Sequence, residues 1–330
     1  MRNSFKKKVF LTSATGFNDL ALELFYYQAK YNSVYAKFLQ LIDVRPENIL
    51  EIDSIPYLPI DFFKDHNICC QSINDQTKVF TSSSTSGLGL SHHYVPDIEL
   101  YHKAFIKSFE YQFGNIEDYT FRFLLPSYLE RKGSSLVYMA DKLLKISGKG
   151  GFYLNNLDKL AEDIIGDKKS GSKVILLGVS FALIDFAENY PMDLSRIIIL
   201  ETGGMKGRKK EITRNELHDF LMQKFNTTFI GSEYGMTELL SQAYSIKDGI
   251  FNCPPWMKIS IGQTTDPFTM EKKGKTGNLK IIDLANIDSC SFISTSDLGR
   301  LNDDGSFEVL GRFDNSDVRG CNLLIAGTSF

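Results

Sequence analysis

The chain has 330 residues, of which 43% are hydrophobic and 12% aromatic, so it can bury one large core or two unequal ones. This composition excludes a largely disordered protein. Lysine and arginine number 37 against 40 acidic residues, a net charge of -3, and the longest basic runs are the short stretches 6–8 and 208–210. The charge therefore gives no indication of a nucleic-acid partner.

The cysteines argue for a reduced, cytoplasmic protein. They are odd in number and show no Cys-x-x-Cys spacing, which speaks against a disulfide framework and against a structural zinc site. They are Cys69, Cys70, Cys253, Cys290 and Cys321. The N-terminus lacks an apolar stretch of signal-peptide length, and no run approaches the ~20 residues of a membrane helix. We expect a soluble protein without an integral membrane segment.

The first quarter of the chain combines a helical region with an extended connector. Between 18 and 43 the apolar residues recur at intervals of three and four, the period of one helix face, which predicts a long helix or two. Pro56 and Pro59 then interrupt the stretch 55–63, which we expect to be extended.

Strand and helix signals alternate in the middle of the chain. Strands are predicted at 78–80, 120–125, 173–179, 196–200 and 227–231, and helices near 97–109, 136–144, 180–188 and 211–225. This order indicates βα organisation, and continuous apolar strands such as 173–179 indicate a sheet covered on both faces.

The last third has short strands and tight turns, among them Asp304-Gly305, which predicts a hairpin. The fold class is therefore α/β with a mainly antiparallel β part near the C-terminus. We divide the chain into a domain at 1–314 and a short tail at 315–330 that carries Cys321. Within the domain, 1–75 is the helical and connector part, 76–240 the α/β part and 241–314 the β-rich part.

A loop rich in hydroxyl groups follows the strand predicted at 78–80. Hydroxyl and backbone N–H groups donate to phosphate oxygens, and glycine lets the main chain approach them closely. The loop consists of Thr81, Ser82, Ser83, Ser84, Thr85, Ser86 and Gly87. No lysine follows as in a Walker loop, so a P-loop kinase or GTPase is disfavoured. Taken alone, the stretch fits a Ser/Thr-rich surface turn better than a phosphate site.

Three further polar segments follow strands or turns. Thr202-Gly203-Gly204 comes after an apolar strand, where open α/β sheets bind ligands. The stretch 231–238 offers an aromatic ring, a glycine, a hydroxyl and a carboxylate, which suit a base, a phosphate and Mg²⁺. A carboxylate at Asp297 and a guanidinium at Arg312 could bind a ribose diol and a phosphate, or serve as hairpin residues.

In their order and spacing these four segments resemble the adenylate-forming superfamily of acyl-CoA synthetases, luciferases and peptide-synthetase adenylation domains. Within it the chain is most similar to the LuxE-type acyl-protein synthetases (long-chain-fatty-acid–protein ligases). It shares their short length, the Ser91-His92 pair behind the hydroxyl-rich loop, and the ending around Gly320-Cys321-Asn322. The resemblance spans roughly 55–324.

The resemblance implies a role for each segment. The stretch from Thr81 to Gly87 would hold the pyrophosphate of ATP, and Asp297 would bind the ribose hydroxyls with Arg312 nearby. The adenine would be framed by Gly203, Gly204, Tyr234 and Gly235. The catalytic residues would be Thr237 and Glu238, which serve phosphate and Mg²⁺, with Glu238 as the metal ligand, and Cys321.

The resemblance also implies the reaction and its participants. A carboxylic acid, which is a fatty acid in the related enzymes, would be activated by ATP and Mg²⁺ to an acyl-adenylate with release of pyrophosphate. Cys321 would then accept the acyl group as a thioester and deliver it to a LuxC-like acyl reductase partner. The chain departs from the superfamily in lacking most of its usual mobile C-terminal domain.

Other interpretations stay open at this stage. One is an acyl- or aryl-CoA ligase of the phenylacetate-CoA ligase type, with coenzyme A as acceptor, and another is a non-catalytic nucleotide-binding module. His92 and His93 follow the hydroxyl-rich loop. A histidine there, with His92 as the candidate, would lie near the substrate carboxylate or merely cover the loop.

Overall fold

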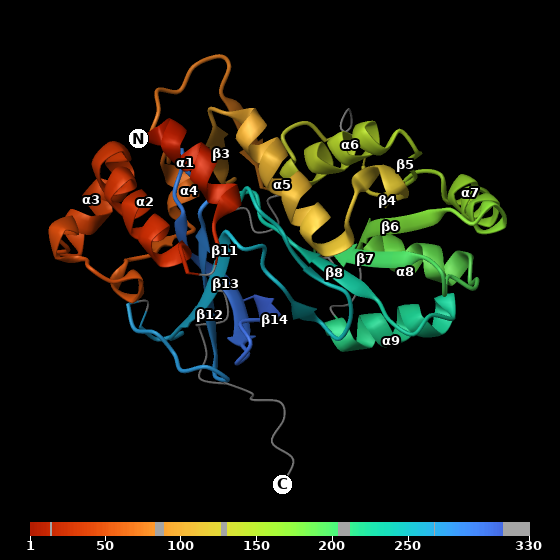
Figure 1. Cartoon of the computed structure of the whole chain (residues 1–330). Helices are drawn as coiled ribbons and strands as arrows, with labels where there is room; N and C mark the ends of the chain where they lie inside the picture. The colour runs from red at the N-terminus through yellow and green to blue at the C-terminus, as the bar shows by residue number, and fades with distance from the viewer. Residues whose placement is uncertain (14, 83–88, 127–130, 204–211, 267, 313–330) are drawn as a thin grey trace, which may run out of the picture.

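The computed structural model describes residues 1–13, 15–82, 89–126, 131–203, 212–266 and 268–312. Two six-stranded sheets organise them, one mostly parallel and one mostly antiparallel. Figure 1 shows the N-terminal helices beside the antiparallel sheet and the remaining helices around the parallel sheet. Along the described part of the chain, no helix is both long and apolar enough to span a membrane.

The N-terminal part is mainly helical and contains one short strand. Its helices are α1 (Arg2–Lys8), α2 (Phe17–Tyr31), α3 (Ser33–Leu41) and α4 (Phe62–Asp65). The helical prediction for 18–43 is confirmed as two helices, because the side chain of Asn32 accepts from the backbone N–H groups of Val34 and Tyr35 and starts α3 anew. The expected connector holds β1 (Leu58–Pro59), which pairs in parallel with the antiparallel sheet.

The parallel sheet has the strand order β5-β4-β6-β7-β8-β9, and only its edge strand β9 runs antiparallel. Its strands are β4 (Tyr119–Leu124), β5 (Gly150–Phe152), β6 (Lys173–Val179), β7 (Ile198–Thr202), β8 (Gly231–Tyr234) and β9 (Ala243–Ser245). The helices are α5 (Ile98–Phe113), α6 (Ser135–Ser147), α7 (Leu157–Ser170), α8 (Ser180–Asn189) and α9 (Arg214–Phe225).

These helices cover both faces of the parallel sheet. In Figure 1, α5 and α6 lie above the strands and α8 and α9 below them. Every residue of β6 after Lys173 is consequently buried, as the continuous apolar run predicts. The strand predicted at 227–231 is wrong in its bounds: Asn226, at φ +45°, ends α9 and the chain enters β8 only at Gly231. The motif at 231–234 is therefore the strand itself.

The antiparallel sheet has the order β10-β14-β13-β12-β11, with β1 added along β13. Its strands are β10 (Ile250–Phe251), β11 (Met257–Gly262), β12 (Thr276–Asp283), β13 (Phe292–Leu301) and β14 (Phe307–Arg312). The hairpin predicted at Asp304-Gly305 joins β13 to β14, with Gly305 at φ +87°. A separate pair, β2 (Lys78–Thr81) and β3 (His92–Val95), carries the start of the hydroxyl-rich loop.

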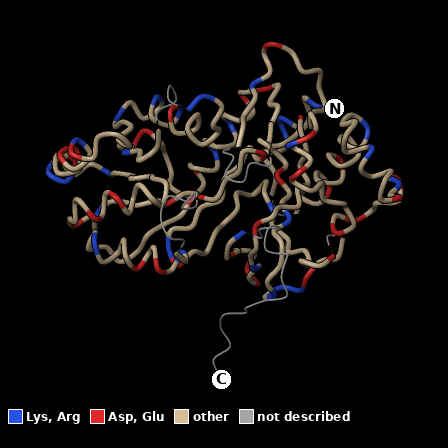
Figure 2. The backbone as a smooth tube through the Cα atoms, turned by 180° about the vertical axis from the view of Figure 1, so that it is seen from behind, with Lys and Arg blue, Asp and Glu red and all other residues tan. Residues whose placement is uncertain are grey.

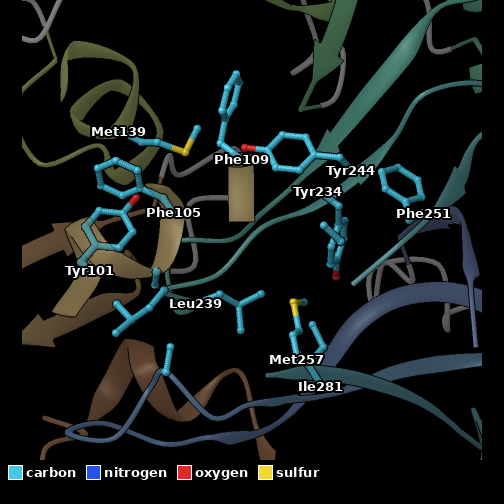
Figure 3. Close-up of a cluster of buried hydrophobic side chains, with 14 of the residues drawn as sticks. Tyr101, Phe105, Phe109, Met139, Tyr234, Leu239, Tyr244, Phe251, Met257 and Ile281 are labelled. Atoms are coloured by element: carbon cyan, nitrogen blue, oxygen red, sulfur yellow. The ribbon is translucent and has the colours of Figure 1, made fainter. Parts of the chain in front are cut away.

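The two sheets share one core. Figure 3 shows side chains of α5 and α6 meeting those of β8 and the antiparallel strands, with Tyr234 between Phe251 and Leu239. Aromatic edge contacts continue from Phe109 to Tyr244 at 6.4 Å between ring centroids. On the outside, Figure 2 shows acidic and basic residues interspersed over both halves of the backbone. The two sheets are therefore fixed to one another by apolar packing.

Candidate functional site

The predicted adenine-binding segment lies at the carboxyl ends of β7 and β8, where parallel sheets bind ligands. Thr202 is the last residue of β7, and Gly203 follows at φ +68°, a conformation that favours glycine. The hydroxyl of Ser180, at the start of α8, donates to the carbonyl of Gly203 at 2.6 Å. This bond holds the turn after β7 in place. Gly204 lies outside the described residues.

Tyr234 and Asp297 come together from the two sheets. The hydroxyl of Tyr234 donates to Oδ2 of Asp297 at 2.8 Å across 63 positions of sequence. The ring of Tyr234 packs edge-on against Phe251 and Phe307, at 6.0 and 5.6 Å between centroids. Asp297 faces Arg312 across the β13–β14 pair. Thus a ring, a carboxylate and a guanidinium, predicted from separate motifs, belong to one site.

Burial governs the charge of Asp297. It raises the pKa of this carboxyl, although the Tyr234 hydroxyl and the positive charges of Arg312 and Arg214 act in the opposite direction. The carboxylate therefore has little contact with water and a strong tendency to accept further hydrogen bonds. Two neighbouring hydroxyl groups, as in a ribose, could supply them.

Thr237 and Glu238 lie in the turn that follows β8. Asp283 on β12 fixes the next residues, since its Oδ2 accepts from the backbone N–H groups of Leu240 at 2.9 Å and Ser241 at 3.0 Å. Glu238 is buried, and burial raises its pKa, against the opposing effects of a hydrogen bond with Ser91 and the charge of Arg312. A buried carboxyl next to another carboxylate favours a nearby cation.

The described residues contain no group of three or more His, Cys, Asp or Glu side chains that could hold a metal by itself. Mg²⁺ in nucleotide sites, however, needs only one or two protein ligands and takes its other ligands from phosphate and water. Glu238, whose pKa is raised by burial and by Asp297, could supply such a ligand. The residues present are thus compatible with a Mg²⁺ ion that arrives with ATP.

The hydroxyl-rich loop begins on a supported strand. The N–H of Thr81 donates to the carbonyl of Gly133 at 2.8 Å, and the N–H of Ser91 donates to Oγ of Ser82 at 3.0 Å. The bond between Ser91 and Ser82 joins the loop's two ends, and the bond to Gly133 ties the strand to a neighbouring segment. Four predicted phosphate ligands and a glycine lie outside the described residues: Ser83, Ser84, Thr85, Ser86 and Gly87.

The two histidines after the loop lie on opposite faces of β3. His93 and Ser91 are 1% and 4% exposed and face Thr237 and Glu238, whereas His92 is half-buried on the other face, opposite Thr81. The structure thus brings His93, and not the predicted His92, against the turn of Thr237 and Glu238. His92 as a substrate contact stays a prediction.

Two buried carboxylates near β7 and β8 have no counterpart in the sequence prediction. Glu233 accepts a hydrogen bond from Thr202, and burial together with the charge of Glu201 raises its pKa to about 7. Burial acts on Glu201 too, but hydrogen bonds from His218 and Ser232 and the charge of Arg214 lower its pKa below the usual value. No alternation in the sequence of β8 indicates the carboxylate as buried, because all four residues of this strand are buried.

Arg214 connects this carboxylate pair to the other sheet. Its Nε donates to Glu201 at 3.1 Å, and another nitrogen of the guanidinium donates to the backbone carbonyl of Val309 on β14. The guanidinium also lies over the ring of Phe251 at 5.2 Å. The two sheets that carry Tyr234 and Asp297 are therefore linked by charge and hydrogen bonds of Arg214 as well as by packing.

Comparison with known proteins adds to this geometry. No known protein family matches the sequence, and no curated protein does. Among solved structures, 2-hydroxyisobutyryl-CoA ligase in complex with 2-HIB-AMP and CoA matches with a TM-score of 0.65 and 11% identity, over 90% of this chain and 69% of that one. The chain has the fold of the adenylate-forming enzymes.

Two further structures agree. ATP-bound MatB from Rhodopseudomonas palustris has a TM-score of 0.54 and 14% identity over 71% of this chain, and MenE from Bacillus subtilis, in complex with AMP, has 0.51 and 18% over 72%. This chain covers 47% and 49% of those two chains, about half their length. At such identities the likeness concerns the fold alone, and it confirms the predicted large α/β domain with its antiparallel β part.

Proposed function

We propose that this protein activates a carboxylic acid with ATP to an acyl-adenylate and passes the acyl group to a thiol. The observation that carries the proposal is the meeting of Tyr234 and Asp297 at 2.8 Å, beside the turn after β7 and the buried Glu238, on the fold of adenylate-forming enzymes. Three of the similar structures contain bound ATP, AMP or an acyl-AMP.

In this proposal the sheet ends bind the nucleotide. The ring of Tyr234 and the turn of Gly203 and Gly204 frame the adenine, with Gly235 allowing close approach, and Asp297 accepts hydrogen bonds from the ribose. Arg312 balances the charge of Asp297. The loop from Thr81 to Gly87 donates to the β- and γ-phosphates.

The chemistry then follows from charge. A carboxylate oxygen of the acid forms a bond to the α-phosphorus of ATP, and the bond from that phosphorus to the bridging oxygen breaks, so that pyrophosphate leaves with its electron pair. Mg²⁺, when bound by Glu238, supplies charge neutralisation for the phosphates. Thr237 offers its hydroxyl to the phosphate, and the two sheets exclude water from the anhydride.

The acceptor of the acyl group is Cys321 in the proposal, by the resemblance to LuxE-type synthetases. A thiolate attacks the acyl carbon, a thioester forms, and AMP leaves. Burial raises the pKa of all four cysteines in the described ranges, that of Cys290 to about 12. Such thiols are poor nucleophiles. Cys321 lies outside the described residues. In the proposal the substrate is a fatty acid, and a LuxC-like reductase partner receives the acyl group from Cys321.

Covalent labelling tests the acceptor. The protein is incubated with ATP, Mg²⁺ and a series of carboxylic acids of increasing chain length, and its mass is measured before and after hydroxylamine, which cleaves thioesters. We expect the wild type to gain one acyl group per chain, which hydroxylamine removes. Cys321→Ser should gain none, and Cys290→Ser should gain one as the wild type does. A label that persists in Cys321→Ser contradicts the acceptor assignment without touching the adenylation step.

Coenzyme A is the second candidate acceptor. It is favoured by the structural match to 2-hydroxyisobutyryl-CoA ligase, which covers 90% of this chain and was determined with CoA. In that case the same incubation, with CoA added, gives a free acyl-CoA and no protein label. Binding of ATP without either product would instead indicate a nucleotide-binding module.

A further inference from the structure

A buried hydrogen-bond cluster lies directly behind the turn of Thr237 and Glu238. His93 on β3 is 1% exposed, and its Nδ1 lies 2.8 Å from the carbonyl oxygen of Thr237. Its Nε2 lies 3.1 Å from Oδ1 of Asn286, which is also 1% exposed. One imidazole ring thus contacts both the catalytic turn and the segment between β12 and β13.

Asn286 contacts the same turn with its other end. Its Nδ2 donates to the carbonyl of Glu238 at 2.8 Å and to the carbonyl of Cys290 at 3.0 Å. Because both acceptors are backbone carbonyls, they fix the orientation of the amide and point Oδ1 at His93. Gln28 on α2 donates in turn to the carbonyl of Asn286 at 2.9 Å. Consecutive carbonyls of the turn are therefore bound by two side chains whose own positions are fixed.

The proton of His93 can be assigned from these contacts. Thr237 presents a carbonyl, which only accepts, so Nδ1 must carry a hydrogen for that bond to form. Burial lowers the pKa of His93 to about 4, so the ring is neutral near pH 7 and has a single N–H. A neutral ring has one hydrogen for two accepting oxygens, and the shorter contact, to Thr237, takes it, so Nε2 meets the Oδ1 of Asn286 without a hydrogen between them. An N–H donor at this position is thus what the turn requires.

The same face of β3 also contacts the side chain of Glu238. Ser91, which directly precedes β3 and lies two residues before His93, forms a hydrogen bond with the Glu238 carboxyl. Side chains two apart on a strand share a face, so Ser91 and His93 contact neighbouring parts of the turn. The strand leads directly from the hydroxyl-rich loop, since the N–H of Ser82 donates to the carbonyl of Ser91 at 3.2 Å.

We propose that His93, together with Asn286, is a positioning residue that holds Thr237 and Glu238 in place beside Ser82 and Ser91. The inference rests on the proposed function, in which these residues serve phosphate and Mg²⁺. His93 touches neither nucleotide nor metal in this account. It acts on the metal site through the backbone of the turn, in the way that hydrogen-bond partners behind a metal ligand do.

Two substitutions at His93 separate its donor from its bulk. His93→Phe keeps an aromatic ring against Phe63, which lies edge-on to the imidazole at 5.9 Å, but removes the N–H. His93→Gln retains one amide donor. His102→Gln is the matched control, because His102 is a buried histidine on α5 that bonds to the hydroxyl of Tyr138 at 2.8 Å, away from the turn.

The first readout is the Mg²⁺ dependence of pyrophosphate exchange into ATP, with the acid that gives the highest rate. We expect His93→Phe to raise the half-saturating Mg²⁺ concentration by about 10-fold. In His93→Gln, which retains a donor, this concentration should rise less. His102→Gln should lower the melting temperature but leave the Mg²⁺ dependence as in the wild type. Equal Mg²⁺ dependence in all four proteins overturns the proposal.

The second readout does not need activity. Amide hydrogen exchange is measured over 239–241, where the N–H groups of Leu240 and Ser241 bind Asp283. We expect faster exchange there in His93→Phe than in wild type and in His102→Gln, with β6 unchanged. Unchanged exchange over 239–241 overturns the proposed positioning role of His93. If the wild type exchanges no pyrophosphate with any acid, the proposed function fails while this measurement still decides the role of His93.

Discussion

Glu233 offers a prediction whose magnitude follows from its surroundings. This carboxyl is 8% exposed on β8, accepts a hydrogen bond from Thr202 and lies near the ionised Glu201. Burial, with Glu201, raises its pKa from 4.5 to about 7. Glu233→Gln preserves the size of the side chain and an oxygen acceptor for Thr202, but it cannot ionise.

The raised pKa makes stability depend on pH in a defined direction. Below pH 4.5 the group is protonated in both states and has no effect. As pH rises from 4.5 to about 7, the unfolded chain loses the proton while the folded protein keeps it. Ionisation therefore stabilises the unfolded state relative to the folded state, and the free energy of unfolding falls. Above that range the loss is complete, at about 3 kcal/mol for this difference in pKa.

Urea unfolding at about pH 5 and about pH 8 measures the effect. The unfolding free energy of Glu233→Gln minus that of wild type should increase by about 2–3 kcal/mol between the two pH values. Glu110→Gln, at an exposed position on α5, is the control and should show no such increase. A Glu233→Gln difference that is the same at both pH values would refute the account of this carboxyl.

Three further substitutions test other parts of the structure. Phe292→Ala removes a ring that packs on Phe25 and Tyr35, and should cost about 3–5 kcal/mol in urea unfolding; a loss under about 1 kcal/mol contradicts this packing. Arg122→Ala leaves Asp167 buried without its bidentate partner and should cost about 3–5 kcal/mol by the same assay. An unchanged free energy of unfolding would show that the pair does not stabilise the fold. Asp297→Asn keeps an acceptor for Tyr234 but removes the charge, and should weaken ATP binding in calorimetry by about 10-fold; undiminished affinity argues against ribose binding.

Much of the fold was predictable because local patterns agree with the tertiary structure. The apolar run at 173–179 becomes the central strand β6, buried on both faces, and Asp304-Gly305 turns the β13–β14 hairpin. By contrast, α7 (Leu157–Ser170) escaped prediction because its many charged residues leave only a narrow apolar stripe, with Leu160, Ala161 and Ile164 buried.

Individual residues of the candidate site can be named from the sequence, but the contacts between them cannot. Tyr234 and Asp297 were each named from a motif, but their hydrogen bond depends on two sheets meeting. The choice between His92 and His93 depends on the register of β3, in which Phe80 lies opposite His93. The raised pKa of Glu233 likewise follows from burial that no short motif encodes.

Transfer of an oxygen atom tests the central claim most directly. The acid that supports pyrophosphate exchange is prepared with oxygen-18 in its carboxylate, and the nucleotide product is analysed by mass spectrometry after acyl transfer to a thiol. In the proposed route the carboxylate oxygen forms the bond to the α-phosphorus and stays there, so AMP carries one oxygen-18 and pyrophosphate carries none. Formation of ADP with oxygen-18 in inorganic phosphate, or unlabelled AMP, would contradict adenylation.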